Sequence, residues 1–229
     1  MKTPLIATFG VALIALTAAA PAAPSILKDR GGKAAVQLET ALSESGGTAN
    51  ETNLGDLIAD AIRQTGHAQV GLVPADEING EAAVAAGKTD PSAIIATLRY
   101  ADDPSETVVV LNLTGAQLLK VVERSVSRAP QPFEGFLQVS GLKVRYSPSQ
   151  PEGKRVSLTN AEGSEVDAAK TYRVATTRPI AGGALGYFQI WSQKDIAEDT
   201  GVSVAKSLGE YLDAHKTINS TVEGRILTR

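Results

Sequence analysis

Side chains that could carry out catalysis on their own are scarce in this chain of 229 residues. There are only two histidines, His67 and His215, and no cysteine. A histidine metal centre usually needs two or more converging imidazoles, and the lack of cysteine excludes thiolate ligands and cysteine nucleophiles. Two histidines still permit a Ser-His-Asp arrangement. However, both lie at predicted helix ends, where a structural or solvated role is favoured.

Two pairs of neighbouring carboxylates, Asp76-Glu77 and Asp102-Asp103, are the other candidates for acid-base chemistry. Both pairs lie in predicted loops, where adjacent acids usually form a solvated surface. The nucleophile elbow, the phosphate-binding P-loop and the dinucleotide-binding fingerprint are missing from the sequence. The sequence therefore predicts neither a self-sufficient active site nor a metal site. An unrelated enzyme on the same scaffold stays open in principle, but it would need a converged acid-base pair that the sequence does not identify.

The composition is that of an ordinary globular protein. The chain is 43% hydrophobic and 21% charged, with 22 Lys and Arg against 25 Asp and Glu, so its formal net charge is −3. There is enough apolar surface for a sizeable core, and there is no basic footprint that would indicate a nucleic-acid partner. The length favours one domain once the N-terminus is trimmed.

The N-terminus has the pattern of a secretory signal peptide. Lys2 supplies a positive charge, Leu5–Thr17 is apolar, and Ala20-Pro21-Ala22 fits the small-residue cleavage rule. The apolar run is shorter than the roughly 20 residues that span a bilayer, which makes an uncleaved anchor the weaker alternative. We predict a signal peptide at 1–22, an N-terminal segment at 23–44 and one domain at 45–229. The mature protein would be exported to the periplasm or the extracellular space, with no membrane association after cleavage.

The candidate residues must be positioned by a mixture of helices and strands. Helical periodicity begins at Leu54 and ends near Gly66, and Asp90-Pro91 predicts a helix start that continues to Leu98. Thr114 and Gln117 form a capping-box pattern that opens a third helix, and a fourth follows Gly201. Strand patterns occur at Val70–Val73, Thr107–Leu113, Leu142–Tyr146, Arg155–Leu158 and Tyr172–Thr176. Helix-strand units followed by hairpins predict an α+β fold.

Several longer motifs follow one another along the chain. They are ETNLGDLIADA at 51–61, VVLNLTGAQL at 109–118, ERSV at 123–126, GFLQVSGL at 135–142, KTYRVAT at 170–176, a glycine-rich loop at 182–186, and GRI at 224–226. Together these motifs resemble one family, the C-terminal domain of the secreted 5′-nucleotidases. The resemblance covers roughly residues 45 to 228, and the motifs occur in the family's order.

The resemblance implies a layered α/β/β/α domain and a division of labour. Full-length members of the family carry a separate metallophosphoesterase domain with two metal ions, where hydrolysis occurs. The C-terminal domain binds the nucleoside end of the substrate and stacks the base between two aromatic side chains. The matching aromatic positions in this chain are Phe136 and Tyr187, and Gly183 belongs to the matching glycine-rich loop.

The polar positions depart from the family pattern. Pro74 stands at the position of the family's asparagine, Asn79 at that of its arginine, and Leu185 at that of the loop aspartate. Arg178, just before the glycine-rich loop, is the residue that could compensate. Arginine is difficult to replace at a bidentate oxyanion site, and the two acids at 76–77 would repel phosphate. A nucleoside or another uncharged aromatic ligand therefore fits these residues better than a nucleotide phosphate.

Two functions follow as expectations. The first is a stand-alone substrate-binding domain that acts as the accessory half of a split nucleotidase. In that case a separately encoded metallophosphoesterase would supply the divalent metals, and this chain alone would release no phosphate from AMP. The alternative is an extracytoplasmic nucleoside-binding module without catalysis. In both cases the partner is a nucleoside or nucleotide-like small molecule, and the chain itself holds no cofactor.

Overall fold

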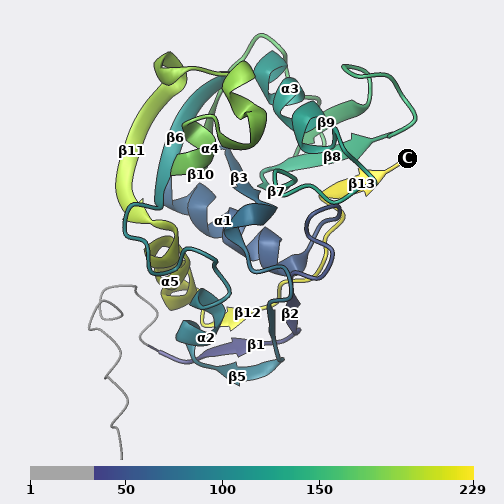
Figure 1. The fold of residues 1–229 in the computed structure, drawn as a ribbon. Coiled ribbons are helices and arrows are strands. Elements are labelled where there is room, and N and C mark those ends of the chain that lie inside the picture. The colour runs from purple at the N-terminus through teal and green to yellow at the C-terminus, as the bar shows by residue number, and fades with distance from the viewer. Residues whose placement is uncertain (1–33) are drawn as a thin grey trace, which may run out of the picture.

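A computed structural model describes residues 34–229 of the chain (Figure 1). The predicted signal peptide at 1–22 and residues 23–33 of the predicted N-terminal segment lie outside these residues. Among the helices of residues 34–229, none is both long and apolar enough to cross a membrane.

The centre of the fold is a five-stranded mixed sheet. Its strand β6 (Thr107–Thr114) has the sequence TVVVLNLT, and most of its side chains are buried, as expected for a β-branched run covered on both faces. Strands β3 and β10 are parallel neighbours, and the other pairings are antiparallel. The order across the sheet is β11 (Ile196–Ser203), β6, β10 (Thr171–Thr177), β3 (Val70–Pro74) and β7 (Leu137–Ser140).

Helices α1 (Asn53–Thr65) and α5 (Val204–Ala214) cover one face of this sheet. The predicted periodicity of α1 is confirmed, since its apolar residues enter the core that also contains α5. The N-cap of α1 is Thr52, whose hydroxyl accepts the Gly55 N–H at 3.0 Å. The helix ends one residue before Gly66, and the left-handed residue is His67, with φ 44°.

A small helix and two short sheets extend this core. Helix α2 (Pro91–Ile95) is capped by Asp90 as predicted, but it ends before Leu98, which instead forms a β-bridge with Ile78. The short sheets are β12 (Thr217–Ile218), β1 (Val36–Leu38) and β5 (Gly87–Thr89), and β2 (Leu42–Ser43) with β4 (Ala83–Val84). Because β1 and β2 pair with strands of the domain, residues 34–44 are part of the same unit rather than a separate segment.

The opposite face is covered by α3 (Gly115–Ser125) and a second sheet. The second sheet has the order β13 (Ile226–Thr228), β8 (Leu142–Tyr146) and β9 (Val156–Asn160), and α3 contacts both β6 and β9. Figure 1 shows these elements together, on the side away from α5. The capping box of Thr114 and Gln117 is present as predicted. The predicted α+β class is confirmed.

Gly141 lets the chain pass from the central sheet into the second sheet. It lies between β7 and β8, with φ 77°. A Cβ atom there would lie 2.0 Å from the carbonyl oxygen of Gln69. Only glycine fits both the left-handed backbone and this close approach.

Candidate functional site

The candidate site is the edge of the central sheet at the carboxyl ends of β3 and β10. Because these strands are parallel neighbours, the segments that follow them begin at the same edge: the 3₁₀ turn η2 (Ala75–Glu77), and helix α4 (Arg178–Ala181) with the turn η3 (Ala184–Gln189). The loop that leads into β6 lies there too, since the Arg99 N–H donates to the Glu77 carbonyl at 2.8 Å. A small cavity of about 180 Å³ adjoins this edge.

The two aromatics predicted to stack a base are buried in the core. Phe136 is 1% exposed and Tyr187 is 0% exposed. The Tyr187 hydroxyl donates to the Gly135 carbonyl at 2.8 Å, and its ring stacks on Trp191 with 5.3 Å between centroids. The stacking role predicted for these two residues is therefore corrected. In this structure they pack in the core beneath α3, and neither ring is open to a ligand.

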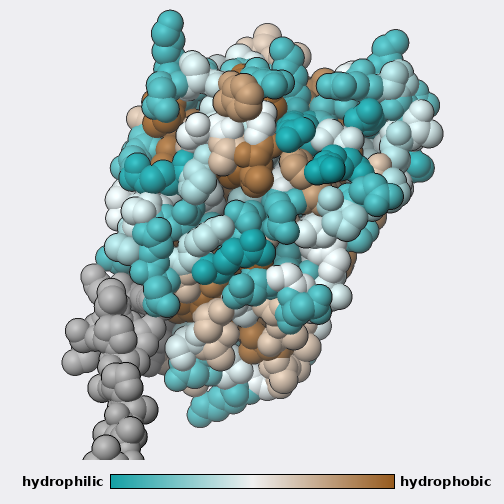
Figure 2. Space-filling view, viewed as in Figure 1, coloured by the Kyte–Doolittle hydropathy of each residue, from teal (hydrophilic) through white to brown (hydrophobic). Residues whose placement is uncertain are grey.

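Two other aromatics of the same edge are exposed. Phe188, on the turn after β10, is 65% exposed, and Tyr100, on the loop before β6, is 37% exposed. Figure 2 shows hydrophobic residues at the surface over the segment of α4 and η3. The sequence analysis missed both residues. The available signal was the pair Tyr187-Phe188, because adjacent residues of a tight turn point in different directions.

Gly183 positions Phe188. It has φ 93°, and a Cβ atom there would lie 2.6 Å from the Cβ of Phe188. The Phe188 N–H also donates to the Gly183 carbonyl at 3.1 Å. Gly183 therefore lies at this edge and has a backbone role there, while its role in ligand binding stays a prediction.

Asn79 and Arg178 are both exposed at this edge, but they form hydrogen bonds with different segments of the protein. The Asn79 N–H donates to the carbonyl of Thr97 at 2.9 Å. Arg178 donates from Nε to the carbonyl of Ser105 at 2.9 Å and forms an ion pair with Asp199. The guanidinium that was expected to compensate for the missing arginine is thus already paired with a carboxylate.

Acidic side chains dominate the electrostatics of the edge. Arg99 pairs with Asp76 at 2.6 Å and lies 3.7 Å from Glu134. The Tyr100 hydroxyl donates to Asp76 at 3.0 Å. Since Arg99 and Arg178 both face carboxylates, a phosphate group would compete with acids for them and would be repelled by the acids it displaces.

A buried pair of carboxyl groups lies beneath the edge. Glu77 is 2% exposed and Glu106 is 6% exposed, and each carboxyl group affects the ionisation of the other. Burial, together with the neighbouring Glu106 charge, raises the pKa of Glu77 to about 9, and burial also raises the pKa of Glu106. The pair therefore keeps at least one proton at neutral pH.

This proton predicts a loss of stability at high pH. The folded-state pKa of Glu77 lies above its ordinary value of 4.5, so its contribution is complete below pH 4.5 and is lost as pH rises through about 9. We expect the melting temperature to be roughly 4–8 °C lower at pH 9 than at pH 5.5, about 2 kcal/mol. In Glu77→Gln the amide replaces the proton donor, so the difference should shrink. The exposed Glu81→Gln variant is the control, and equal pH dependence in wild type and Glu77→Gln would contradict the assignment.

The remaining predicted candidates do not form a catalytic arrangement. His67 is exposed just after α1, and the exposed His215 stacks on Tyr211, at the end of α5. Across residues 34–229, no three His, Cys, Asp or Glu side chains come together in a way that could hold a metal ion.

Comparison with known proteins gives one consistent result. The family model described as "5′-nucleotidase, C-terminal domain" matches residues 30–193. A 5′-nucleotidase from Diplobatis ommata is 26% identical over 202 residues, which covers 77% of this chain and 33% of that protein. A snake venom 5′-nucleotidase from Naja atra is 31% identical over 131 residues, which covers 53% of this chain and 24% of that protein.

The solved structures agree with the sequence relatives. The crystal structure of a 5′-nucleotidase precursor from Thermus thermophilus is 29% identical and has a TM-score of 0.71. The match covers 84% of this chain and 39% of that protein. The chain thus spans only a quarter to about two fifths of the relatives named here.

Proposed function

The chain belongs to the family of the 5′-nucleotidase C-terminal domain, and we propose that it binds the nucleoside end of a nucleotide-like ligand at the edge formed by the loops after β3 and β10. Hydrolysis would take place elsewhere, at a metallophosphoesterase domain that supplies the divalent metals. In this proposal the chain is the accessory half of a nucleotidase, and it acts outside the cytoplasm after export.

The observation that carries the proposal is the exposure of Phe188 and Tyr100 on two separate loops of this edge. Among the large hydrophobic side chains of residues 34–229, Phe188 is the most exposed, whereas its neighbours Tyr187 and Trp191 are buried. A nucleobase has two π faces, and stacking on an aromatic side chain contributes about 1–3 kcal/mol per base. Two exposed rings at one edge therefore fit the base end of a nucleoside.

The pairing of the arginines supports a ligand whose phosphate is held by another domain. Arg178 is paired with Asp199 and Arg99 with Asp76, so neither guanidinium is free to form a bidentate contact with phosphate. Metal ions in a catalytic domain would bind the phosphate oxygens instead. The nucleoside contacts of this chain would then orient the substrate for that domain.

Binding of adenosine and AMP by isothermal titration calorimetry tests the proposal. We expect the two affinities to agree within about threefold, because Arg99 and Arg178 are both paired with carboxylates. Phe188→Ala and Tyr100→Ala should each weaken binding by about 5- to 150-fold, equal to 1–3 kcal/mol of lost stacking. Tyr100→Phe keeps the ring and should retain most of the affinity.

Val222→Ala is a matched control, because Val222 is an exposed hydrophobic residue outside the edge, at 59% exposure. AMP binding more than tenfold tighter than adenosine binding would contradict the phosphate argument. Unchanged affinity in both aromatic variants would show that the exposed rings do not contact the ligand.

An independent nucleoside-binding module without catalysis is the second candidate. The same neutralised arginines favour it, because such a module has no need to hold a phosphate. The two functions differ in what a metallophosphoesterase partner would add. Both functions give the chain alone an affinity for adenosine, so AMP hydrolysis separates them. Mixing the two proteins should increase AMP hydrolysis for the accessory function and leave it unchanged for the independent module.

A further inference from the structure

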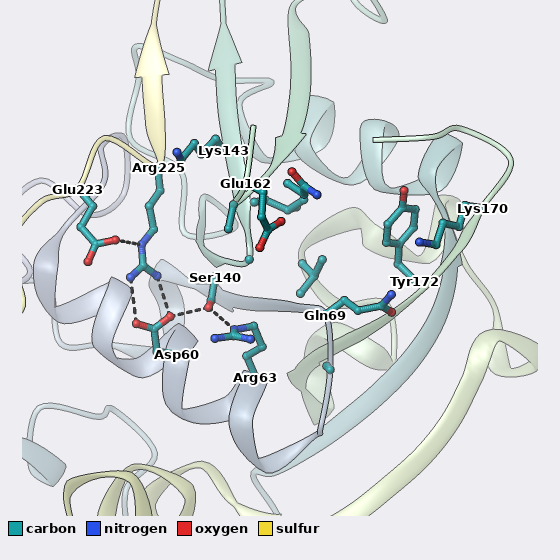
Figure 3. A pocket seen from close by; sticks show the side chains of 16 residues that line it. Asp60, Arg63, Gln69, Ser140, Lys143, Glu162, Lys170, Tyr172, Glu223 and Arg225 are labelled. Carbon is teal, nitrogen blue, oxygen red and sulfur yellow. Dashed lines mark hydrogen bonds and ion pairs between the residues drawn. The ribbon is translucent and has the colours of Figure 1, made fainter. Parts of the chain in front are cut away.

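We infer that the hollow at the opposite end of the central sheet is a second binding site, for a small molecule that carries a multivalent oxyanion. This site does not depend on the proposed function, because it lies at the amino end of β3 and the carboxyl end of β7, a strand length away from the aromatic edge. Its volume is about 660 Å³, within the range of small-molecule sites. Figure 3 shows that α1, the start of β3, the β7–β8 connection and the C-terminal segment surround it.

The wall on the side of α1 is fixed by a chain of ion pairs and hydrogen bonds. Arg225 forms a fork with Asp60, with both nitrogen–oxygen distances at 2.9 Å. The Ser140 hydroxyl donates to Asp60 at 2.5 Å and accepts from the Nε of Arg63 at 2.6 Å. The dashed lines of Figure 3 follow this chain from Arg225 to Arg63. The orientation of Arg63 is therefore set before any ligand arrives.

This series of ion pairs and hydrogen bonds leaves Arg63 with a charge that no acid of the described residues neutralises. Asp60 is occupied by Arg225 and Ser140, and Glu223 lies 3.1 Å from the Nε of Arg225. Within residues 34–229, no carboxylate forms an ion pair with Arg63. A preoriented guanidinium whose terminal nitrogens lack an acidic partner is suited to a bidentate contact with an oxyanion.

The opposite side of the hollow supplies further donors. The Gln69 side-chain oxygen accepts the Arg173 N–H at 2.7 Å, and the Asn160 side-chain oxygen accepts the Ser164 N–H at 2.8 Å. Both amide oxygens are thus engaged by the backbone, and each amide is left with its NH₂ group as a donor. A ligand that bonds to these NH₂ groups must present acceptors.

Two lysines complete the charge of the site. Lys143 and Lys170 both line the hollow and are exposed, and the Lys170 ammonium lies 5.5 Å from the centre of the Tyr172 ring. Glu162, on an exposed turn, is the acid of the lining that has no ion pair in the described structure. Over the whole lining there are four cations and three acids, an excess of one positive charge in a chain whose overall charge is −3. Three of these cations, Arg63, Lys143 and Lys170, have no ion pair in the described structure, so the chemistry matches an anion that more than one cation can contact.

Calorimetry of the full chain with pyrophosphate and with succinate, at constant ionic strength, tests this site. We expect saturable binding of at least one of the two anions. The double variant Lys143→Gln/Lys170→Gln should weaken it at least tenfold. The control Lys88→Gln/Lys194→Gln removes the same charge from exposed positions outside the hollow and should leave the affinity within twofold. Arg63→Gln should also weaken binding, while adenosine binding at the other edge stays unchanged.

Each outcome decides the inference. Tighter binding of pyrophosphate assigns the site to phosphate-bearing ligands, and tighter binding of succinate assigns it to dicarboxylates. No saturable binding of either anion would overturn the inference. An equal loss in the two double variants would also overturn it, because the attraction would then come from overall charge rather than from the hollow.

Discussion

Replacing Tyr187 with alanine is expected to lower the free energy of unfolding by about 3–5 kcal/mol, the range for truncating a fully buried aromatic side chain. The residue is 0% exposed, stacks on Trp191 and donates a hydrogen bond to the Gly135 carbonyl. Removal of the ring would leave a cavity beneath α3 and a buried carbonyl without its partner. Urea denaturation followed by circular dichroism would measure the loss.

The neighbouring residue provides the matched control. Phe188 is 65% exposed, so Phe188→Ala should change the free energy of unfolding by less than about 1 kcal/mol. Tyr187→Phe keeps the ring and removes only the hydroxyl, which should cost about 1–2 kcal/mol. If Tyr187→Ala retained full stability but lost nucleoside affinity, the base-stacking role first predicted for Tyr187 would be restored.

Tyr187 and Phe188 show which features could be predicted from the sequence and which could not. The elements themselves could be predicted, because periodicity and capping are local: the apolar spacing of α1, the β-branched run of β6, and the box of Thr114 and Gln117 each depend on residues close in the chain. Which of two adjacent aromatics enters the core depends instead on what packs against the turn. At the turn η3, Tyr187 enters the core because its ring stacks on Trp191 and because Gly183, just before the turn, has a left-handed conformation.

The electrostatics of the aromatic edge were partly predictable. The acids at 76–77 were visible in the sequence, and they do neutralise an arginine of the edge. The pairing of Arg178 with Asp199 was not predictable, because it joins the first residue of α4, directly after β10, to β11, and β6 lies between these two strands in the sheet. The buried pair of Glu77 and Glu106 likewise brings together two loops whose contact depends on the parallel alignment of β3 and β10.

One long-range contact did leave a signal in the sequence. Asp56 and Asp60 are one helical turn apart in α1, on or beside a face that is otherwise apolar. A buried carboxylate needs a cation or a proton, so such a pair predicts a partner from elsewhere in the chain. The structure supplies Arg225, which lies 3.6 Å from Asp56 and forms the fork with Asp60. This contact attaches the C-terminal segment to α1.

Removal of this cation should therefore be among the most damaging single changes in the chain. Arg225→Met keeps most of the side-chain volume but leaves Asp56, which is fully buried, and Asp60 without a cation. We expect a loss of about 3–5 kcal/mol in the free energy of unfolding, as for other buried ion pairs that lose one partner. Arg225→Lys should lose about half as much, because an ammonium keeps the charge but cannot form the fork with Asp60 and still reach the Val139 carbonyl.

The pH dependence separates a charge effect from simple loss of packing. Burial raises the pKa of Asp56 to about 9 even though Arg225 opposes this shift, so removal of Arg225 should raise the pKa further. The loss of stability in Arg225→Met should then be smaller near pH 6, where Asp56 is protonated in both proteins, and larger above about pH 9, where only the wild-type protein keeps the attraction between Arg225 and the Asp56 carboxylate. The exposed Arg229→Met, which removes a guanidinium directly after β13, is the control and should lose little stability at either pH. A deficit that is equal at both pH values would mean that Arg225 acts through packing, with no need for its charge.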